Sequence, residues 1–248
     1  MLSKIEGIVI RTQDYGESNK VVILFTRDRG KLAAMARGAK KPKSRVGAAT
    51  QPFTLGQYLC FAGNGMATIS QADILQSHYP LRADLFLTAY TAYMTELLDR
   101  LTEDKEPHPF LYELLATTLS HLEEGTDPDI LSRIFELKVL EAVGYRPRLD
   151  GCAVCGKVEG PMKFSVSQGG LICLEDARHD SQALPLSPPA ARILKLLQRV
   201  TPDRLGQVQV KEETKNQMER VIRSFMDEYV DLRFKSRPFL DRLRKEDP

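Results

Sequence analysis

The first 75 residues contain five short segments with the texture of β-strands, and this pattern limits the fold more than any other feature of the chain. Each segment is a β-branched or alternating run, with turn-forming residues between, as at 15–19, 28–30 and 41–42. The 28–30 segment resembles a tight hairpin. Five short strands fit a small closed barrel, most often an OB-fold, although an SH3-like barrel would have a similar pattern. The predicted strands are residues 6–12, 20–26, 31–37, 58–63 and 66–75.

From residue 82 the apolar spacing changes to that of amphipathic helices. Three stripes occupy 82–145, with breaks at 103–109 and at Asp127-Pro128, and Gly144 is a predicted helix C-cap. Helical spacing returns at 188–200 and 212–234. The sequence therefore predicts an α+β protein with an N-terminal barrel and a helical domain into which a zinc-finger-like Cys module is inserted. The expected boundaries are 1–80 for the barrel, 81–149 and 183–248 for the helical domain, and 150–182 for the module.

Charge is strongly segregated along the chain, although the net charge is only +2. Residues 1–80 carry +6, residues 81–150 carry −7 and residues 151–248 carry +3. The first region resembles a polyanion-binding surface, and the acidic region is available for protein contacts. The alternative is charge scattered over solvated faces.

Neither a membrane segment nor a secretory signal is evident. No apolar run approaches the ~20 residues of a membrane helix. Charges at positions 4, 6 and 11 interrupt the N-terminal segment, which has no long apolar region. We therefore expect a cytoplasmic protein with no membrane partner.

The densest basic segment is residues 37–45, which hold five positive side chains and no acid. Gly38 and Pro42 disfavour a regular helix, so a flexible loop between barrel strands is expected. Such a loop suits the phosphate backbone, and binding should weaken steeply with salt. The alternative is a merely solvated loop, and charge alone does not separate DNA from RNA. The basic residues are Arg37, Lys40, Lys41, Lys43 and Arg45; candidate stacking aromatics outside the loop are Tyr15, Phe53, Tyr58 and Phe61.

A Cys-x2-Cys pair and a third cysteine after a Gly-Gly turn predict a metal site. Cys152, Cys155 and Cys173 lie within 22 residues, a spacing that favours metal over disulfides in a cytosolic chain. Structural zinc prefers four tetrahedral ligands. Asp176 has the better spacing for the fourth and His179 is the better generic zinc ligand; Asp176 is narrowly preferred. The alternatives are a module that has lost its metal, a redox motif and a catalytic zinc.

No pattern of an active site is present. Walker A, GxGxxG, GxSxG and HExxH motifs are absent, and no general base accompanies the cysteines. His78, His108 and His121 are interpreted as surface or capping residues, and Cys60 as a core residue. A binding protein is favoured over an enzyme, and an RNA-binding zinc-ribbon protein remains the main alternative to a DNA-binding one.

Three stretches together resemble the bacterial recombination mediator family RecO. They are GIVIRTQDYGESNKVVILFTRDRGKLAAMARGAKKPKSR, FELKVLEAVGYRPRLDGCAVCG and LRFKSRPFL, and the likeness runs over nearly the whole chain. The resemblance implies an OB-fold that binds single- and double-stranded DNA, and annealing of complementary strands without nucleotide hydrolysis. It also implies partnership with RecR, contact with the single-stranded-DNA-binding protein, and help in loading RecA.

The resemblance also assigns site residues. DNA binding carries over to Arg37, Lys40, Lys41, Lys43 and Arg45, with Lys20 and Lys31 added. The zinc pattern carries over to Cys152, Cys155 and Cys173. Asp176 departs from it, because a fourth cysteine is typical of zinc-bearing members, and this departure puts metal affinity in doubt. A cytoplasmic, nucleoid-associated location is the matching expectation.

Overall fold

The computed structural model describes residues 2–61, 66–205, 209–230 and 232–246, which form two compact units. Unit 1 contains residues up to Thr126 together with those from Phe234 onward, and unit 2 contains Asp127–Arg233. Both units combine helices and strands, so the α+β class predicted from the sequence is confirmed. Residues 62–63, the end of the fourth predicted strand, lie outside the described residues.

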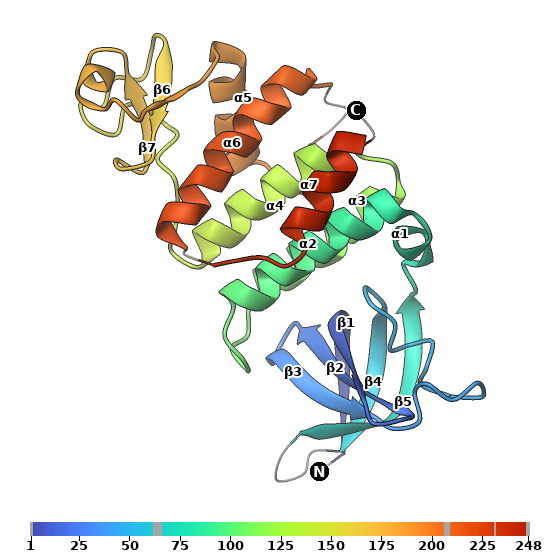
Figure 1. Ribbon diagram of the computed structural model, residues 1–248. Coiled ribbons are helices and arrows are strands. Elements are labelled where there is room, and N and C mark those ends of the chain that lie inside the picture. The colour runs from blue at the N-terminus through green and yellow to red at the C-terminus, as the bar shows by residue number, and fades with distance from the viewer. Residues whose placement is uncertain (1, 62–65, 206–208, 231, 247–248) are drawn as a thin grey trace. The chain divides into compact units, whose positions relative to one another are not determined.

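The five predicted strands are present in unit 1 and close into a barrel (Figure 1). The order is β1-β2-β3-β5-β4 with β4 returning to β1, and every pair is antiparallel except β3–β5. This Greek-key order is that of an OB-fold, so the first of the two expected barrels is correct. The strands are β1 Leu2–Tyr15, β2 Asn19–Thr26, β3 Gly30–Ala36, β4 Leu55–Phe61 and β5 Ala67–Gln76.

Alternating residues of these strands fill the barrel. A register shift between Val9 and Arg11 lets β1 pair with β4 through its first half and with β2 through its second. Cys60 is 2% exposed within the barrel core, which confirms it as a core residue. Thr26 pairs with Gly30, so the predicted tight hairpin is present as a three-residue turn.

The helices of unit 1 begin and end where local sequence directs them. Asp84 caps α2 by accepting a hydrogen bond from the Leu87 N–H at 2.8 Å, and Pro109 occupies the first turn of α3. Within unit 1, Tyr112 on α3 donates to Glu6 on β1 at 3.0 Å and so joins helix to barrel. The helices are α1 Tyr79–Ala83, α2 Leu85–Leu101, α3 Pro109–Glu123 and α7 Arg237–Glu246.

His78 corrects one expectation about unit 1. The sequence predicts a surface or capping residue at this position, but His78 is only 2% exposed. It occupies the N-cap position of α1 without a side-chain capping bond, and its Nδ1 lies 3.0 Å from Glu123 Oε2. Burial lowers the pKa of His78, and Glu123 opposes that effect.

Unit 2 is built around α4, whose residues from Ile130 to Leu140 are all buried. Asp127 caps its start and Gly144, with φ +91°, follows its end, as the sequence predicts. The predicted helix at 212–234 is too long, because α6 ends at Tyr229 and the chain then enters α7, which was not foreseen. The helices of unit 2 are α4 Pro128–Ala142, η1 Asp176–His179, α5 Pro188–Arg199, η2 Pro202–Arg204 and α6 Glu212–Tyr229.

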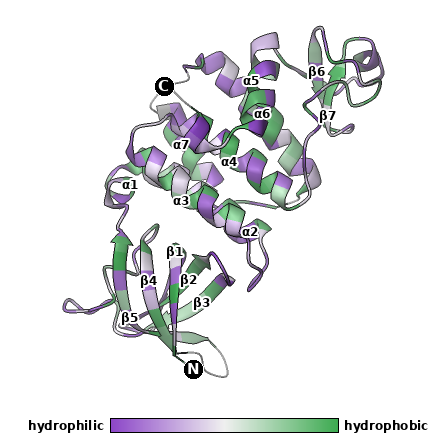
Figure 2. Ribbon diagram, turned by 180° about the vertical axis from the view of Figure 1, so that it is seen from behind, coloured by the Kyte–Doolittle hydropathy of each residue, from purple (hydrophilic) through white to green (hydrophobic). Residues whose placement is uncertain are grey.

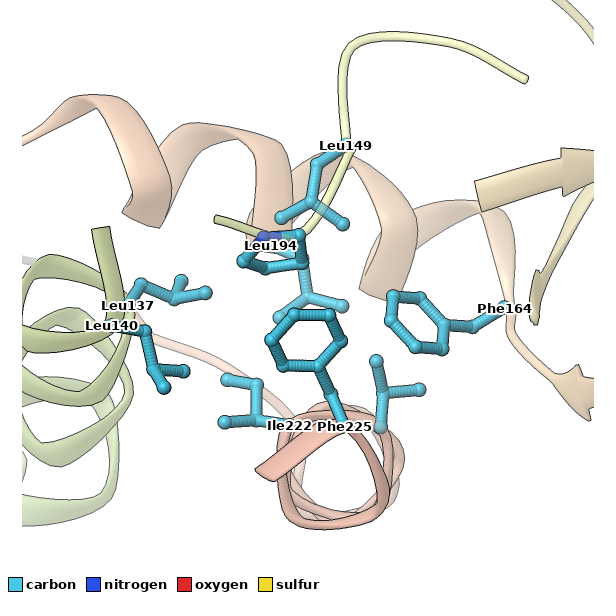
Figure 3. Close-up of a pocket in the computed structure, with 9 residues that line it drawn as sticks. Leu137, Leu140, Leu149, Phe164, Leu194, Ile222 and Phe225 are labelled. Carbon is cyan, nitrogen blue, oxygen red and sulfur yellow. The ribbon is translucent and has the colours of Figure 1, made fainter. Parts of the chain in front are cut away.

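A small sheet extends unit 2 and holds Cys173, whereas Cys152 and Cys155 lie in the segment before it. Its order is β7-β6-β8, with β6 Met162–Ser165, β7 Gly170–Cys173 and β8 Leu184–Pro185. Phe164 of β6 points toward Phe225 of α6 across an apolar pocket that also includes leucines of α4 and α5 (Figure 3). This apolar contact anchors the sheet to the helices. Within the described ranges, no helix is both long and apolar enough to cross a membrane.

Candidate nucleic-acid interface and metal centre

The basic segment lies in the connection between β3 and β4, where no regular helix or strand forms. The connection projects from the barrel (Figure 1) and is hydrophilic along its projecting part (Figure 2). Ala39, Val46 and Ala49 turn inward and join the barrel core, and the Tyr58 hydroxyl donates to the Ala49 carbonyl at 2.7 Å. The remaining side chains are therefore presented outward from a fixed base. Arg37, Lys40, Lys41, Lys43 and Arg45 are all exposed.

Backbone and side-chain bonds hold this loop against the turn between β1 and β2. The Lys40 N–H donates to the Ser18 carbonyl at 3.0 Å, and the Gly38 N–H donates to Asn19 Oδ1 at 2.9 Å. Lys40 Nζ also lies 2.6 Å from Asp14 Oδ2. The segment is a loop, as predicted. These bonds restrain its backbone, however, whereas the sequence predicts a flexible loop.

Lys20 belongs with this group by position. It pairs in register with Asp14 on β1 and with Ala36 on β3, directly where the basic loop begins. The structure therefore brings six of the seven predicted DNA-binding residues to one end of the barrel strands.

Lys31 is placed elsewhere, near the start of β3. Its side chain is 8% exposed, and its Nζ lies 2.6 Å from the Asp99 carbonyl and 3.4 Å from Asp104 Oδ1. The charge is compensated inside unit 1, where it joins the barrel to α2.

The four aromatic candidates for base stacking divide into two pairs. Phe53 and Tyr58 are 4% and 0% exposed, so neither ring has a free face for a base. Tyr15 and Phe61 are 58% and 52% exposed. Tyr15 ends β1 and directly follows Asp14, whose carboxylate contacts Lys40 of the basic loop.

Cys152, Cys155, Cys173 and Asp176 form one cluster in unit 2, and their ligand atoms all lie within 4.8 Å of one another. Asp176 Oδ2 is 3.0 Å from Cys152 Sγ and 3.1 Å from Cys173 Sγ. Cys173 ends β7 and Asp176 begins η1, so a single turn brings the carboxylate back to the thiols. His179 is exposed at the end of the same turn and lies outside the cluster.

The electrostatics of the cluster suit a cation. Hydrogen bonds from the three thiols lower the pKa of Asp176 to about 2, and the same carboxylate raises the pKa of Cys155 to about 12. Burial and the hydrogen bond to Asp176 would raise the pKa of Cys152, but backbone N–H groups aimed at its sulfur together outweigh both and lower it. These thiol protons are the ones a bound metal replaces. Three sulfurs and a carboxylate form a donor set that Zn²⁺ accepts.

Gly170 sets the distance between β7 and the segment that contains Arg148. Its neighbour across a parallel bridge is Arg148, and a Cβ at position 170 would lie 2.4 Å from the Arg148 carbonyl oxygen. Only glycine allows this approach, which brings the segment before Cys152 against β7.

Comparison with known proteins identifies the family. The family model described as Recombination protein O N terminal matches residues 1–78, and that described as Recombination protein O C terminal matches residues 82–238. The chain belongs to the recombination protein O family. DNA repair protein RecO of Bacillus pumilus (strain SAFR-032) is 49% identical over 243 residues, 98% of this chain and 95% of that protein. The protein of the same name from Bacillus cereus (strain AH187) is 44% identical over 245 residues, 99% of each.

Membership in the recombination protein O family gives the chain a role in DNA repair and recombination. The two matches cover both the barrel that carries the basic loop and the region that carries the Cys–Asp cluster.

Asp14 is the contact of the basic loop that sequence reasoning missed. The signal was present, because a turn at 15–19 places residue 14 opposite Lys20.

Proposed function

We propose that the chain is a non-catalytic recombination mediator that binds single- and double-stranded DNA through one end of its barrel. The observation that carries the proposal is the gathering of Arg37, Lys41, Lys43 and Arg45, with Lys20 and Lys40, on and beside one anchored loop. Side chains of this kind neutralise phosphates without reading bases. Lys31 contributes less in this proposal, because its charge is already bound by Asp99 and Asp104.

The wider activity follows from family membership. In this proposal the protein anneals complementary strands and, with RecR, helps load RecA onto DNA coated by the single-stranded-DNA-binding protein, near the nucleoid in the cytoplasm. The barrel (1–80) is the DNA-binding domain, the Cys module (150–182) is a structural zinc domain, and the helical parts (81–149 and 183–248) offer protein contacts. Zinc held by Cys152, Cys155, Cys173 and Asp176 would fix the turn between β7 and η1.

The test is a titration of fluorescent single-stranded and duplex DNA at several salt concentrations, with matched RNA as competitor. The variant changes Lys40, Lys41 and Lys43 together to Glu, and we expect it to abolish binding while the fold survives. The control changes three exposed lysines outside the loop to Glu, which alters the net charge by the same amount. These lysines are Lys105, Lys211 and Lys235.

Variants that change a single basic residue should bind DNA with an affinity that depends less steeply on salt. Each lost phosphate contact on a single strand should reduce the slope of log affinity against log salt by about 0.7. Undiminished binding by the triple loop variant at low salt would overturn the interface. A strong preference for RNA over single-stranded DNA would favour an RNA-binding protein instead.

A further inference from the structure

Asp14 is an acidic residue in direct contact with the basic loop. Asp14 Oδ2 lies 2.6 Å from Lys40 Nζ, and both side chains reach solvent, at 61% and 34% exposure. Lys20 stands opposite Asp14 in the β1–β2 register. The hydrogen bond from Lys40 lowers the pKa of Asp14, and the charge of Lys20 acts in the same direction.

The contact is an exposed ion pair between the Asp14 carboxylate and the Lys40 ammonium group, and the charge of Lys20 acts on the same carboxylate from farther away. The Lys40 backbone is fixed by its bond to Ser18, and Asp14 is fixed by strand pairing, so the ion pair joins two anchored segments. A carboxylate oxygen at 2.6 Å from Nζ takes the position that a phosphate oxygen would take in a charge-assisted hydrogen bond.

We infer that Asp14 is an internal competitor for DNA: its carboxylate occupies the ammonium group of Lys40 until a phosphate displaces it. The inference rests on the proposed function and adds to it a residue that sets affinity. Exposed ion pairs are weak, so a phosphate displaces the carboxylate readily. The displaced carboxylate then lies close to the incoming phosphate and repels it. Asp14 thus keeps binding weaker than six free cations would make it, and it favours release of the strand.

The test measures dissociation constants for single-stranded DNA with the natural full chain and four variants of it. Asp14→Asn should bind about three- to tenfold more tightly than the natural sequence, because it loses both the pairing and the repulsion. Glu17→Gln is the matched control, since it removes one exposed carboxylate from the adjacent turn. It should change affinity by less than about twofold, the effect of net charge alone.

Lys40→Gln and the double variant Asp14→Asn with Lys40→Gln complete a double-mutant cycle. We expect Asp14→Asn to gain much less in the Lys40→Gln background, because the competition acts through the Lys40 ammonium. Far-ultraviolet circular dichroism and melting of each variant check that the fold is intact.

The outcomes separate this inference from the proposed function. Suppose that the natural chain binds DNA and that Asp14→Asn increases the affinity no more than Glu17→Gln does. The inference that Asp14 competes with DNA is then overturned, and the DNA-binding proposal stands. An equal gain in both Lys40 backgrounds also overturns it. If neither the natural chain nor Asp14→Asn binds DNA at low salt, the proposed function fails and the inference fails with it.

Discussion

The carboxylate of Glu96 on α2 binds Ser236, 140 residues further along the chain, through the serine hydroxyl at 2.5 Å and the backbone N–H at 2.8 Å. The Lys235 N–H donates to the other oxygen of Glu96 at 2.8 Å. Tyr93, one turn earlier on α2, meets Phe234 edge to face at 6.0 Å between centroids. One carboxylate therefore satisfies the backbone donors that precede α7 and attaches this helix to unit 1.

Glu96→Gln should lower the free energy of unfolding by about 1–3 kcal/mol at neutral pH, because hydrogen bonds to a charged acceptor are lost. Thermal or urea unfolding measures the change. Glu103→Gln, an exposed position on the α2–α3 connection, is the control with the same change in charge. Equal stability of the two variants would contradict the role assigned to Glu96.

The effect of Glu96 should also depend on pH. Burial would raise the pKa of Glu96, but bonds from Ser236 and Lys235 outweigh it and hold the pKa below its ordinary value of 4.5. A carboxyl whose pKa is lower in the folded state stabilises the protein above its unfolded pKa and loses that contribution as pH falls through the folded pKa. The stability gap between the natural chain and Glu96→Gln should be constant above about pH 5 and close below pH 4. A gap that widens in acid would be inconsistent with this sign.

Asp176 is predicted to be the fourth zinc ligand. Asp176→Asn should weaken zinc binding by at least the roughly 10- to 100-fold that loss of an outer-shell partner costs, and Asp176→Cys should restore or strengthen it. Zinc competition with a chromophoric chelator gives both affinities. His179→Ala should have no effect, since His179 lies outside the cluster. Zinc loss in His179→Ala with zinc retained in Asp176→Asn would reverse the assignment.

Tyr15 is predicted to stack on an unpaired base. Tyr15→Ala should lower the affinity for single-stranded DNA by about 1–3 kcal/mol and that for duplex DNA by much less, because duplex bases already stack on one another. Parallel anisotropy titrations with both substrates measure the difference. Tyr79→Ala, at a tyrosine that is 64% exposed on α1, serves as the control. Equal losses on both substrates would show that Tyr15 acts by some means other than stacking.

Gly170→Ala should destabilise unit 2 by about 1–3 kcal/mol, as overpacking does, because the added methyl meets the Arg148 carbonyl. The melting temperature of the zinc-loaded protein measures the change. An unchanged melting temperature would mean that the Arg148–Gly170 bridge gives way without cost.

Most of the fold could be predicted from the sequence because its signals are local. Alternation along β2 and β3 gave the strands, and Asp127-Pro128 and Gly144 marked the ends of α4. The sequence does not predict the end of α6, because apolar spacing continues past Tyr229. It does not predict the start of α7 either, because Ser236, just before this helix, binds the distant Glu96. Leu85 and Phe110 match helical stripes but are 60% and 50% exposed, since a stripe does not tell which of its members are covered.

The candidate sites show the same limit. The spacing of Cys152, Cys155 and Cys173 is enough to predict that they lie together, because a local turn and a local hairpin determine their positions. His78 is buried against Glu123, and the charge of Lys31 is compensated by Asp99. Both partners lie in other elements, so local sequence does not reveal them. The exposure of Tyr15 and burial of Tyr58 depend on how the barrel closes, which residue type does not reveal.

The return of α7 to unit 1 has a consequence for the order of synthesis. A ribosome completes α2 and all of unit 2 before it makes the segment that Glu96 binds. Until then the Tyr93 side of α2 lacks the contact that Phe234 later supplies. Because domains tend to fold as they emerge, unit 1 is the first part of the chain to begin folding and the last to finish.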